Sequence, residues 1–284
     1  MTVMLVINTE NVVRKALKEV ENNQLIPDYE KNEKKLREIL NETAQKEAGL
    51  TAKMVHMNDS KTMREVEKEL SAIFGHERVD IIKTSFAIET YRMKVVKKPD
   101  GQSAVQVYQN ESEIQPEKIL TTIYDINMAI AKQSVSLIVE LFICVYSCAG
   151  IGFDLRIAAM PTVYHKVETF VLKLAFQRAR NIFVKAWNEA GVSVWGKAKA
   201  IFYLLKENDV IQLLWKFTNL IFKKTSTRKK IRTIGQIAAM IVATFFKYGA
   251  ALIARFALAV DNGVYLAEKI VNLVTLFDLK KTMN

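Results

Sequence analysis

Proline and glycine are scarce in this chain, and their scarcity constrains its fold more than any other feature. Only 4 prolines and 10 glycines occur among 284 residues, so few positions break a helix or turn the backbone sharply. Half of the residues are hydrophobic and a quarter are charged, which is typical of a folded globular chain. The sequence therefore predicts a mainly α-helical protein.

Apolar residues recur at helical spacing along most of the chain, and this periodicity places the expected helices. A short apolar stripe predicts a helix over residues 11–21, and residues 29–46 have the pattern of a solvated amphipathic helix. Further helices are expected over residues 113–133 and 135–149. From residue 163 the chain is expected to be helical to its end, interrupted by Gly191, Gly196, Asn208, the run 223–228, Gly249 and Gly263.

Residues 86–108 break this helical periodicity. Polar and apolar residues alternate on both sides of Pro99-Asp100-Gly101, which is a turn signal. This pattern predicts one small β-hairpin, whose first strand carries Arg92 and Lys94.

The net charge of +11 is concentrated at one end of the chain. Residues 155–284 hold 21 lysines and arginines against 7 acidic residues, whereas residues 1–154 are close to neutral. Self-repulsion of this size costs stability, so a concentrated excess suggests a polyanionic partner. A soluble surface rich in lysine is the plainer alternative.

Two long apolar stretches, residues 135–151 and 237–260, raise the question of a membrane span. Glu140 interrupts the first stretch, and Lys247 and Arg255 interrupt the second. A span needs about 20 apolar residues with few charges, so buried core helices are the favoured interpretation of both.

Catalytic motifs are missing from the sequence. None of the three histidines lies in a metal-binding or catalytic motif, and no glycine-rich phosphate loop occurs. Cys144 and Cys148 lie four residues apart in an apolar run, where they are expected to behave as small hydrophobic residues in a reducing compartment. The protein is therefore expected not to be an enzyme, and no cofactor or metal ion is expected.

Basic residues alternate with aromatic ones over residues 164–187. Lysine and arginine neutralise phosphates, while exposed aromatic rings can stack on unpaired bases. A solvated face over an aromatic core explains the same pattern equally well. The aromatic residues concerned are Tyr164, Phe170, Phe176, Phe183 and Trp187.

Further basic residues lie where a bound anion would stabilise them. Lys197 and Lys199 follow a glycine near an expected helix start, where positive charge is unfavourable to the helix dipole. Residues 223–232 hold six basic residues and suit phosphate contact, although a nuclear localisation signal has the same composition. Lys247 and Arg255 each lie alone in an apolar helix and are interpreted as lining a groove.

The order of these features resembles the nucleoproteins of segmented negative-strand RNA viruses of the bunyavirus order, in particular those of orthobunyaviruses, tospoviruses and emaraviruses. The resemblance covers residues 80–215 and depends on the basic hairpin, the apolar helix after it, and the segments that begin at Met160, Phe170 and Val194. It implies two helical lobes with a basic groove between them, in which genomic single-stranded RNA is held without sequence specificity.

The resemblance also implies terminal arms that dock on neighbouring protomers to form a homo-oligomer. The expected division is an N-terminal arm over 1–25, an N-terminal lobe over 26–155, a basic C-terminal lobe over 156–262 and a C-terminal arm over 263–284. A viral polymerase is a further implied partner, and the virion and host cytoplasm are the implied locations. The residues expected to make oligomer contacts are Met4, Leu5, Val6, Ile7, Leu273 and Phe277.

The basic residues expected to bind RNA combine those matched by the resemblance with those singled out by their surroundings. They are Arg92, Lys94, Lys166, Lys173, Arg178, Arg180, Lys185, Lys197, Lys199, Lys223, Lys224, Arg228, Lys229, Lys230, Arg232, Lys247 and Arg255.

A second hypothesis comes from a different class of protein. Basic amphipathic helices also bind anionic lipid, so an α-helical pore-forming or membrane-surface-binding protein is the alternative. The charges that interrupt both apolar stretches count against it, and a membrane is not the expected partner. A helical interaction scaffold without nucleic acid is the plainest alternative.

Overall fold

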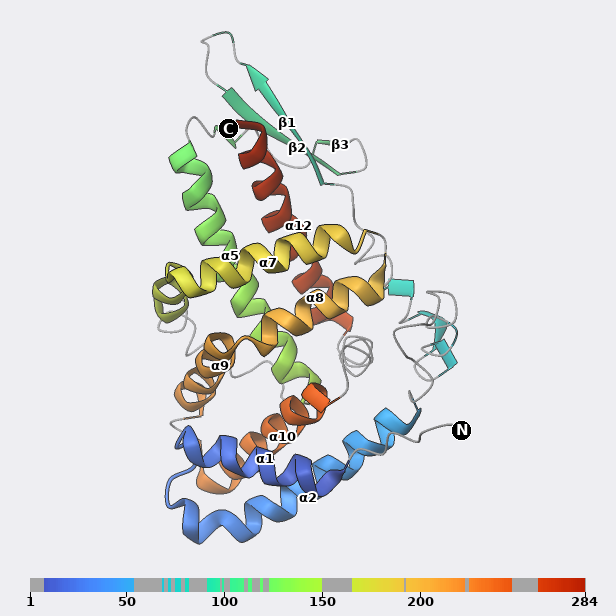
Figure 1. Cartoon of the computed structure of the whole chain (residues 1–284), viewed down its shortest axis with the longest axis vertical. Coiled ribbons are helices and arrows are strands. Elements are labelled where there is room, and N and C mark those ends of the chain that lie inside the picture. Colours follow the sequence, from blue (N-terminus) through green and yellow to red (C-terminus); the bar gives the residue numbers. More distant parts are fainter. Residues whose placement is uncertain are drawn as a thin grey trace.

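The structure is a computed structural model of the whole chain, and its described part is mainly helical, which confirms the predicted fold class (Figure 1). It describes residues 8–53, 68, 71–72, 75–77, 80–81, 91–97, 99, 103–109, 112–113, 118–119, 123–149, 165–191, 193–222, 225–246 and 260–283.

Helices α1 (Thr9–Asn22), α2 (Tyr29–Lys53) and α10 (Thr227–Phe246) pack against one another at one end of the molecule (Figure 1). The Asn8 side chain accepts a hydrogen bond from the Asn11 backbone N–H and so caps the start of α1. The apolar stripe predicted over residues 11–21 is buried, from Val12 to Val20. Its burial explains why α1 is stable although it is only 14 residues long.

Helix α5 (Ile123–Cys148) is a single long helix that packs along α12 (Val260–Met283). Two separate helices, over 113–133 and 135–149, were expected, and that prediction is wrong at both the start and the joint. Residues 112–113 and 118–119 are strands, and Ser134 lies inside α5, where its hydroxyl donates to the Ile130 carbonyl.

The strands lie beyond the ends of α5 and α12 (Figure 1). Strand β1 (Tyr91–Lys97) pairs antiparallel with β2 (Ser103–Gln109), with Lys94 opposite Gln106. The short strands β3 (Ser112–Glu113) and β4 (Lys118–Ile119) also pair with β2. These four strands form one small sheet, and β1 contacts α12.

Helices α7 (Leu174–Glu189), α8 (Val194–Lys206) and α9 (Asn208–Ile221) follow one another with short connections. Gly191, with φ of +52°, adopts the left-handed conformation after the end of α7, and the Ser193 hydroxyl accepts from the Gly196 N–H to cap α8. Gly196 and Gly263, expected to interrupt helices, instead lie inside α8 and α12. A short helical segment over residues 165–171 precedes α7.

Polar contacts join helices that lie far apart in the sequence. The fully buried Trp215 of α9 donates its indole N–H to Glu19 Oε2 of α1 over 3.1 Å. Tyr146 of α5 and Thr218 of α9 share a buried hydrogen bond of 3.1 Å, beside an edge-to-face contact between Phe142 and Phe217. These contacts fix α9 between α1 and α5.

Candidate anion-binding surfaces

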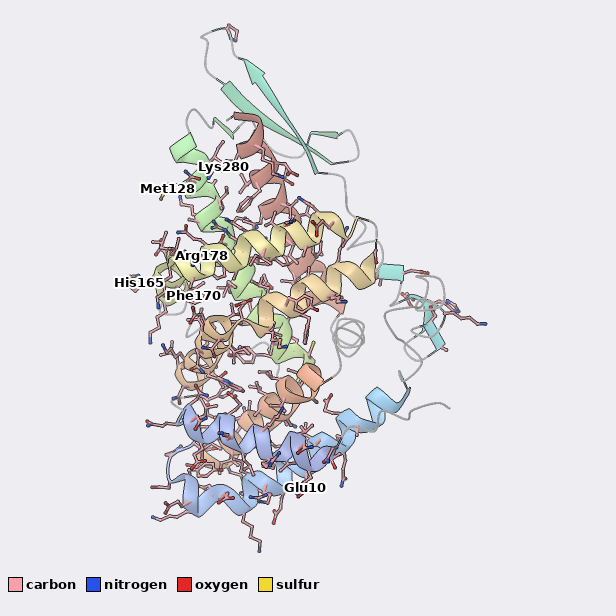
Figure 2. All side chains as sticks on the ribbon, viewed as in Figure 1. Glu10, Met128, His165, Phe170, Arg178 and Lys280 are labelled. Carbon is pink, nitrogen blue, oxygen red and sulfur yellow. The ribbon has the colours of Figure 1, made fainter. Side chains whose placement is uncertain are left out.

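The outward side of α7 carries the most unusual surface in the described part of the chain. Leu174 and Ile182 are 62% and 65% exposed, and the neighbouring Arg178 and Lys185 are exposed as well. Figure 2 labels Arg178 on this helix. These four residues recur at spacings of three and four, so they share one side of the helix. Leu172 and Lys173, both exposed, extend this surface across the start of α7. These six residues, from Leu172 to Lys185, are called the α7 face below.

The opposite side of α7 is the aromatic core. Phe176 lies 5.0 Å from the Phe170 ring, and Phe183 lies 6.0 Å from Trp187, measured between ring centroids. All four side chains are buried. They are therefore not available to stack on bases, and the interpretation of a charged face over an aromatic core is the correct one for these residues.

Arg180, predicted to bind RNA, points inward from α7 toward α5 and α12. Its guanidinium donates to the Ser134 hydroxyl at 3.3 Å and lies 5.1 Å from the centroid of the Phe277 ring. Its buried Nε has no hydrogen-bond partner, and no carboxylate in the described part of the chain pairs with it. Burial lowers the pKa of Arg180 because the charged form loses hydration.

The predicted lysines of α8 are also turned inward. Lys197 is only 3% exposed, and its ammonium lies 5.1 Å from the centroid of the Trp187 ring, in a cation–π contact. Lys199 is half-buried. In this conformation Lys197 stabilises the packing of α8 on α7, and a polyanion cannot reach it.

The first turns of α10 hold a second set of exposed cations, Arg228, Lys229 and Arg232, called the α10 cluster below. Glu42 of α2 lies near Arg232. Its pKa is lowered mainly by a hydrogen bond from Lys46, with a smaller effect from Arg232. The neighbouring Lys230 is buried and donates to Asn219 Oδ1 at 3.2 Å, and burial lowers its pKa. Lys230 therefore anchors α10 to α9.

The seven exposed cations of the prediction fall into two groups on different parts of the fold. Arg178 and Lys185 lie on α7, Lys173 is its N-cap residue, and Lys166 lies on the helical segment before it. Arg228, Lys229 and Arg232 lie on α10, which packs against α1 and α2. The side chains of Arg92 and Lys94, and the residues Lys223, Lys224, Lys247 and Arg255, lie outside the described part.

The residues expected to make oligomer contacts are divided in the same way. Met4, Leu5, Val6 and Ile7 lie outside the described residues. Leu273 is fully buried in the core, and Phe277 is half-buried against Arg180. In this conformation α12 docks on the α5 helix of its own chain, so Leu273 presents no surface to a neighbour.

The exposed apolar residues of the α7 face were missed by sequence reasoning. The signal that could have found them is their helical phase. Leu174 and Ile182 are spaced three or four residues from Arg178 and Lys185, so they share a helix face with them, whereas the core residues Phe176 and Phe183 lie on the opposite face.

The described residues were also compared with the requirements of a metal site and of a membrane-crossing helix. The described residues contain no group of three or more histidine, cysteine or acidic side chains that could hold a metal ion. One described helical segment, Ile126–Cys148 of α5, is long and apolar enough to cross a membrane, with a mean hydropathy of 1.8, and most of it is buried.

Fold and site together define a helical protein with an exposed basic and apolar helix face. Comparison with known protein families, with curated proteins and with solved structures finds no match for this chain.

Proposed function

We propose that the protein is a non-enzymatic, membrane-surface-binding protein that attaches to anionic bilayers through the α7 face. The observation that carries this proposal is the alternation of exposed Leu174 and Ile182 with exposed Arg178 and Lys185 on one side of a helix. Such a face matches the boundary between lipid headgroups and acyl chains.

Both kinds of side chain would gain from this partner. Each cation near an anionic membrane contributes about 1 kcal/mol. Burying an exposed leucine or isoleucine side chain contributes about 1.5–3 kcal/mol. A chain of phosphates would use the cations but leave the apolar side chains in water. Single exposed apolar residues are common on protein surfaces. Leu172, Leu174 and Ile182, however, lie together beside the cations of the α7 face and form a patch.

Vesicle flotation with matched variants tests this proposal. The protein should float with vesicles that contain phosphatidylserine and stay behind with pure phosphatidylcholine. The double variants Leu174→Ser/Ile182→Ser and Arg178→Gln/Lys185→Gln should each lose most of this binding. The control Lys206→Gln/Lys216→Gln removes the same charge from exposed positions on α8 and α9 and should keep it. Equal binding by all variants would contradict the proposal.

Encapsidation of single-stranded RNA is the second candidate, and the α10 cluster favours it. Arg228, Lys229 and Arg232 are exposed, and over residues 227–243, where the side chains of α10 are described, no large exposed apolar side chain lies beside them. The nucleoprotein hypothesis adds two lobes with a basic groove, a homo-oligomer formed by terminal arms, and a place in the virion and host cytoplasm. Its support is the charge of residues 155–284 together with the α10 cluster.

Fluorescence anisotropy with a generic RNA oligomer tests this second candidate. Affinity should fall steeply with salt, with a log–log slope of about −0.7 for each phosphate contacted. Arg228→Gln/Lys229→Gln should flatten this slope, whereas Leu174→Ser/Ile182→Ser should not. If nuclease-treated protein ignores the oligomer at low salt, the nucleoprotein hypothesis fails.

A further inference from the structure

Helix α5 has the dimensions of a membrane-crossing helix although it lies in the core. Its segment Ile126–Cys148 contains 23 residues, which at 1.5 Å per residue span about 35 Å. The hydrocarbon core of a bilayer is about 30 Å thick. Lys132 and Glu140 are the only Lys, Arg, Asp or Glu residues in this segment.

Helix α12 covers the N-terminal half of α5, and helix α7 touches it through Arg180. Helix α12 packs along it, and Gln133 Nε2 of α5 donates to the Lys269 backbone carbonyl at 3.0 Å. Helix α7 is joined to both by Arg180, which contacts Ser134 of α5 and Phe277 of α12. Figure 1 shows α7 running across α5 and α12 at this point.

Arg180 is an incompletely satisfied group at this junction. Its contacts with the described residues are one neutral hydrogen bond and one aromatic ring, while its buried Nε has no hydrogen-bond partner. A guanidinium forms its strongest contacts with phosphate or carboxylate, which accept two parallel hydrogen bonds. A lipid phosphate would therefore satisfy Arg180 better than Ser134 and Phe277 do.

We propose that α5 enters the bilayer after the α7 face has bound, and that Arg180 promotes its release by exchanging Ser134 and Phe277 for a lipid phosphate. This proposal rests on the membrane-binding function proposed above. It adds an activity, the permeabilisation of anionic bilayers, and assigns α12 as the cover that must leave α5.

A reversible cross-link between α5 and α12 tests the release step. Cysteines are introduced by Gln133→Cys and Lys269→Cys in a background of Cys144→Ala/Cys148→Ala, and vesicles of phosphatidylserine and phosphatidylcholine are loaded with a self-quenched dye. The oxidised protein should float with the vesicles without releasing dye, and a reductant should restore leakage. Equal leakage before and after reduction, with the disulfide verified by mass spectrometry, overturns the proposal.

Substitution of Arg180 tests its role separately. Arg180→Met removes the phosphate-seeking group but keeps an apolar side chain in the junction. Leakage per bound protein should fall about tenfold, the effect of losing one strong charge-assisted contact. Flotation should be unchanged, and stability to urea should be equal or higher. Lower stability with faster leakage would show that Arg180 only holds the junction closed, and would overturn its role as the release group.

Arg180→Lys and Ser134→Ala keep the test decisive if the methionine variant does not fold. Lysine keeps the charge but cannot form the two parallel hydrogen bonds, so Arg180→Lys should lower leakage without lowering flotation, whereas Ser134→Ala removes an acceptor of the closed state and should raise leakage. Binding to vesicles without leakage by the unmodified protein overturns the insertion proposal alone. Absence of any binding overturns the proposed function and the insertion proposal together.

Discussion

The fate of single cations shows what a net charge cannot reveal. Lys185 and Lys197 have the same chemistry and lie near aromatic residues in the sequence, yet Lys185 is exposed beside Glu189 and Lys197 is buried against Trp187. Helical periodicity alone predicts that Arg178 and Arg180, two residues apart, point to different sides of α7. The partners of Arg180 on α5 and α12 could not be predicted, because they lie about 46 and 97 residues away along the chain.

Lys197 should therefore contribute to stability and not to binding. Lys197→Ala removes the cation–π contact and the packing of the lysine stem, so the free energy of unfolding should fall by about 1–2 kcal/mol. The exposed Lys185→Ala is the matched control and should change it by less than about 0.5 kcal/mol. Urea denaturation measures both variants. If Lys197→Ala leaves the free energy of unfolding unchanged, the cation–π contact does not stabilise the protein.

Lys230 should make stability depend on pH in a defined direction. Burial lowers its pKa in the folded protein below the ordinary 10.5, so the unfolded chain binds more protons in that range. The cost of burying the charge is fully present at neutral pH and is relieved as pH rises through the lowered pKa. The free energy of unfolding of the unmodified protein, measured against Lys230→Met, should therefore rise from neutral pH toward 10.5. A difference that stays flat or falls would contradict this account.

At the scale of elements, periodicity predicted which segments are helical better than where they begin and end. The stripe over 11–21 matches α1, whereas the helix expected from residue 113 begins at Ile123. The reason is pairing: residues 112–113 and 118–119 join β2, and a strand partner is not visible in local periodicity. Glycine misled the prediction at Gly196, which was expected to interrupt a helix but lies inside α8, where a Cβ atom would come within 2.8 Å of Ala190 Cβ.

Gly235 sets how closely α10 approaches α2. A Cβ atom there would lie 2.9 Å from Ile39 Cγ2 and 3.2 Å from Leu36 Cδ1. Gly235→Ala should therefore destabilise the protein by about 1–3 kcal/mol through overpacking. Gly49→Ala is the control, since Gly49 is exposed on α2 and nothing lies within 4 Å of its Cβ position; it should stabilise the protein by about 0.5–1 kcal/mol. Thermal unfolding measures the stability of both variants. If Gly235→Ala is as stable as the unmodified protein, α10 and α2 can move apart to accept the methyl group.

At the scale of the whole molecule, the positive excess of residues 155–284 divides into three roles. Arg180, Lys197 and Lys230 stabilise the interior. Lys173, Arg178 and Lys185 belong to the α7 face, and Arg228, Lys229 and Arg232 form the α10 cluster. Lys166 and Lys199 belong to neither surface. The sequence predicted the excess and most of its exposed members. It could not predict that the exposed cations would lie on two surfaces, because their separation depends on α10 packing with α1 and α2.

The most direct measurement reports the surroundings of the α7 face itself. An environment-sensitive fluorophore is attached to Ile182→Cys in the Cys144→Ala/Cys148→Ala background, with Lys206→Cys labelled as the control. Adding phosphatidylserine vesicles should shift the emission at position 182 to the blue and increase its intensity, while position 206 stays unchanged and RNA produces no shift. If the label at position 182 keeps its aqueous emission on vesicles to which the protein has bound, the α7 face is not the membrane-binding surface.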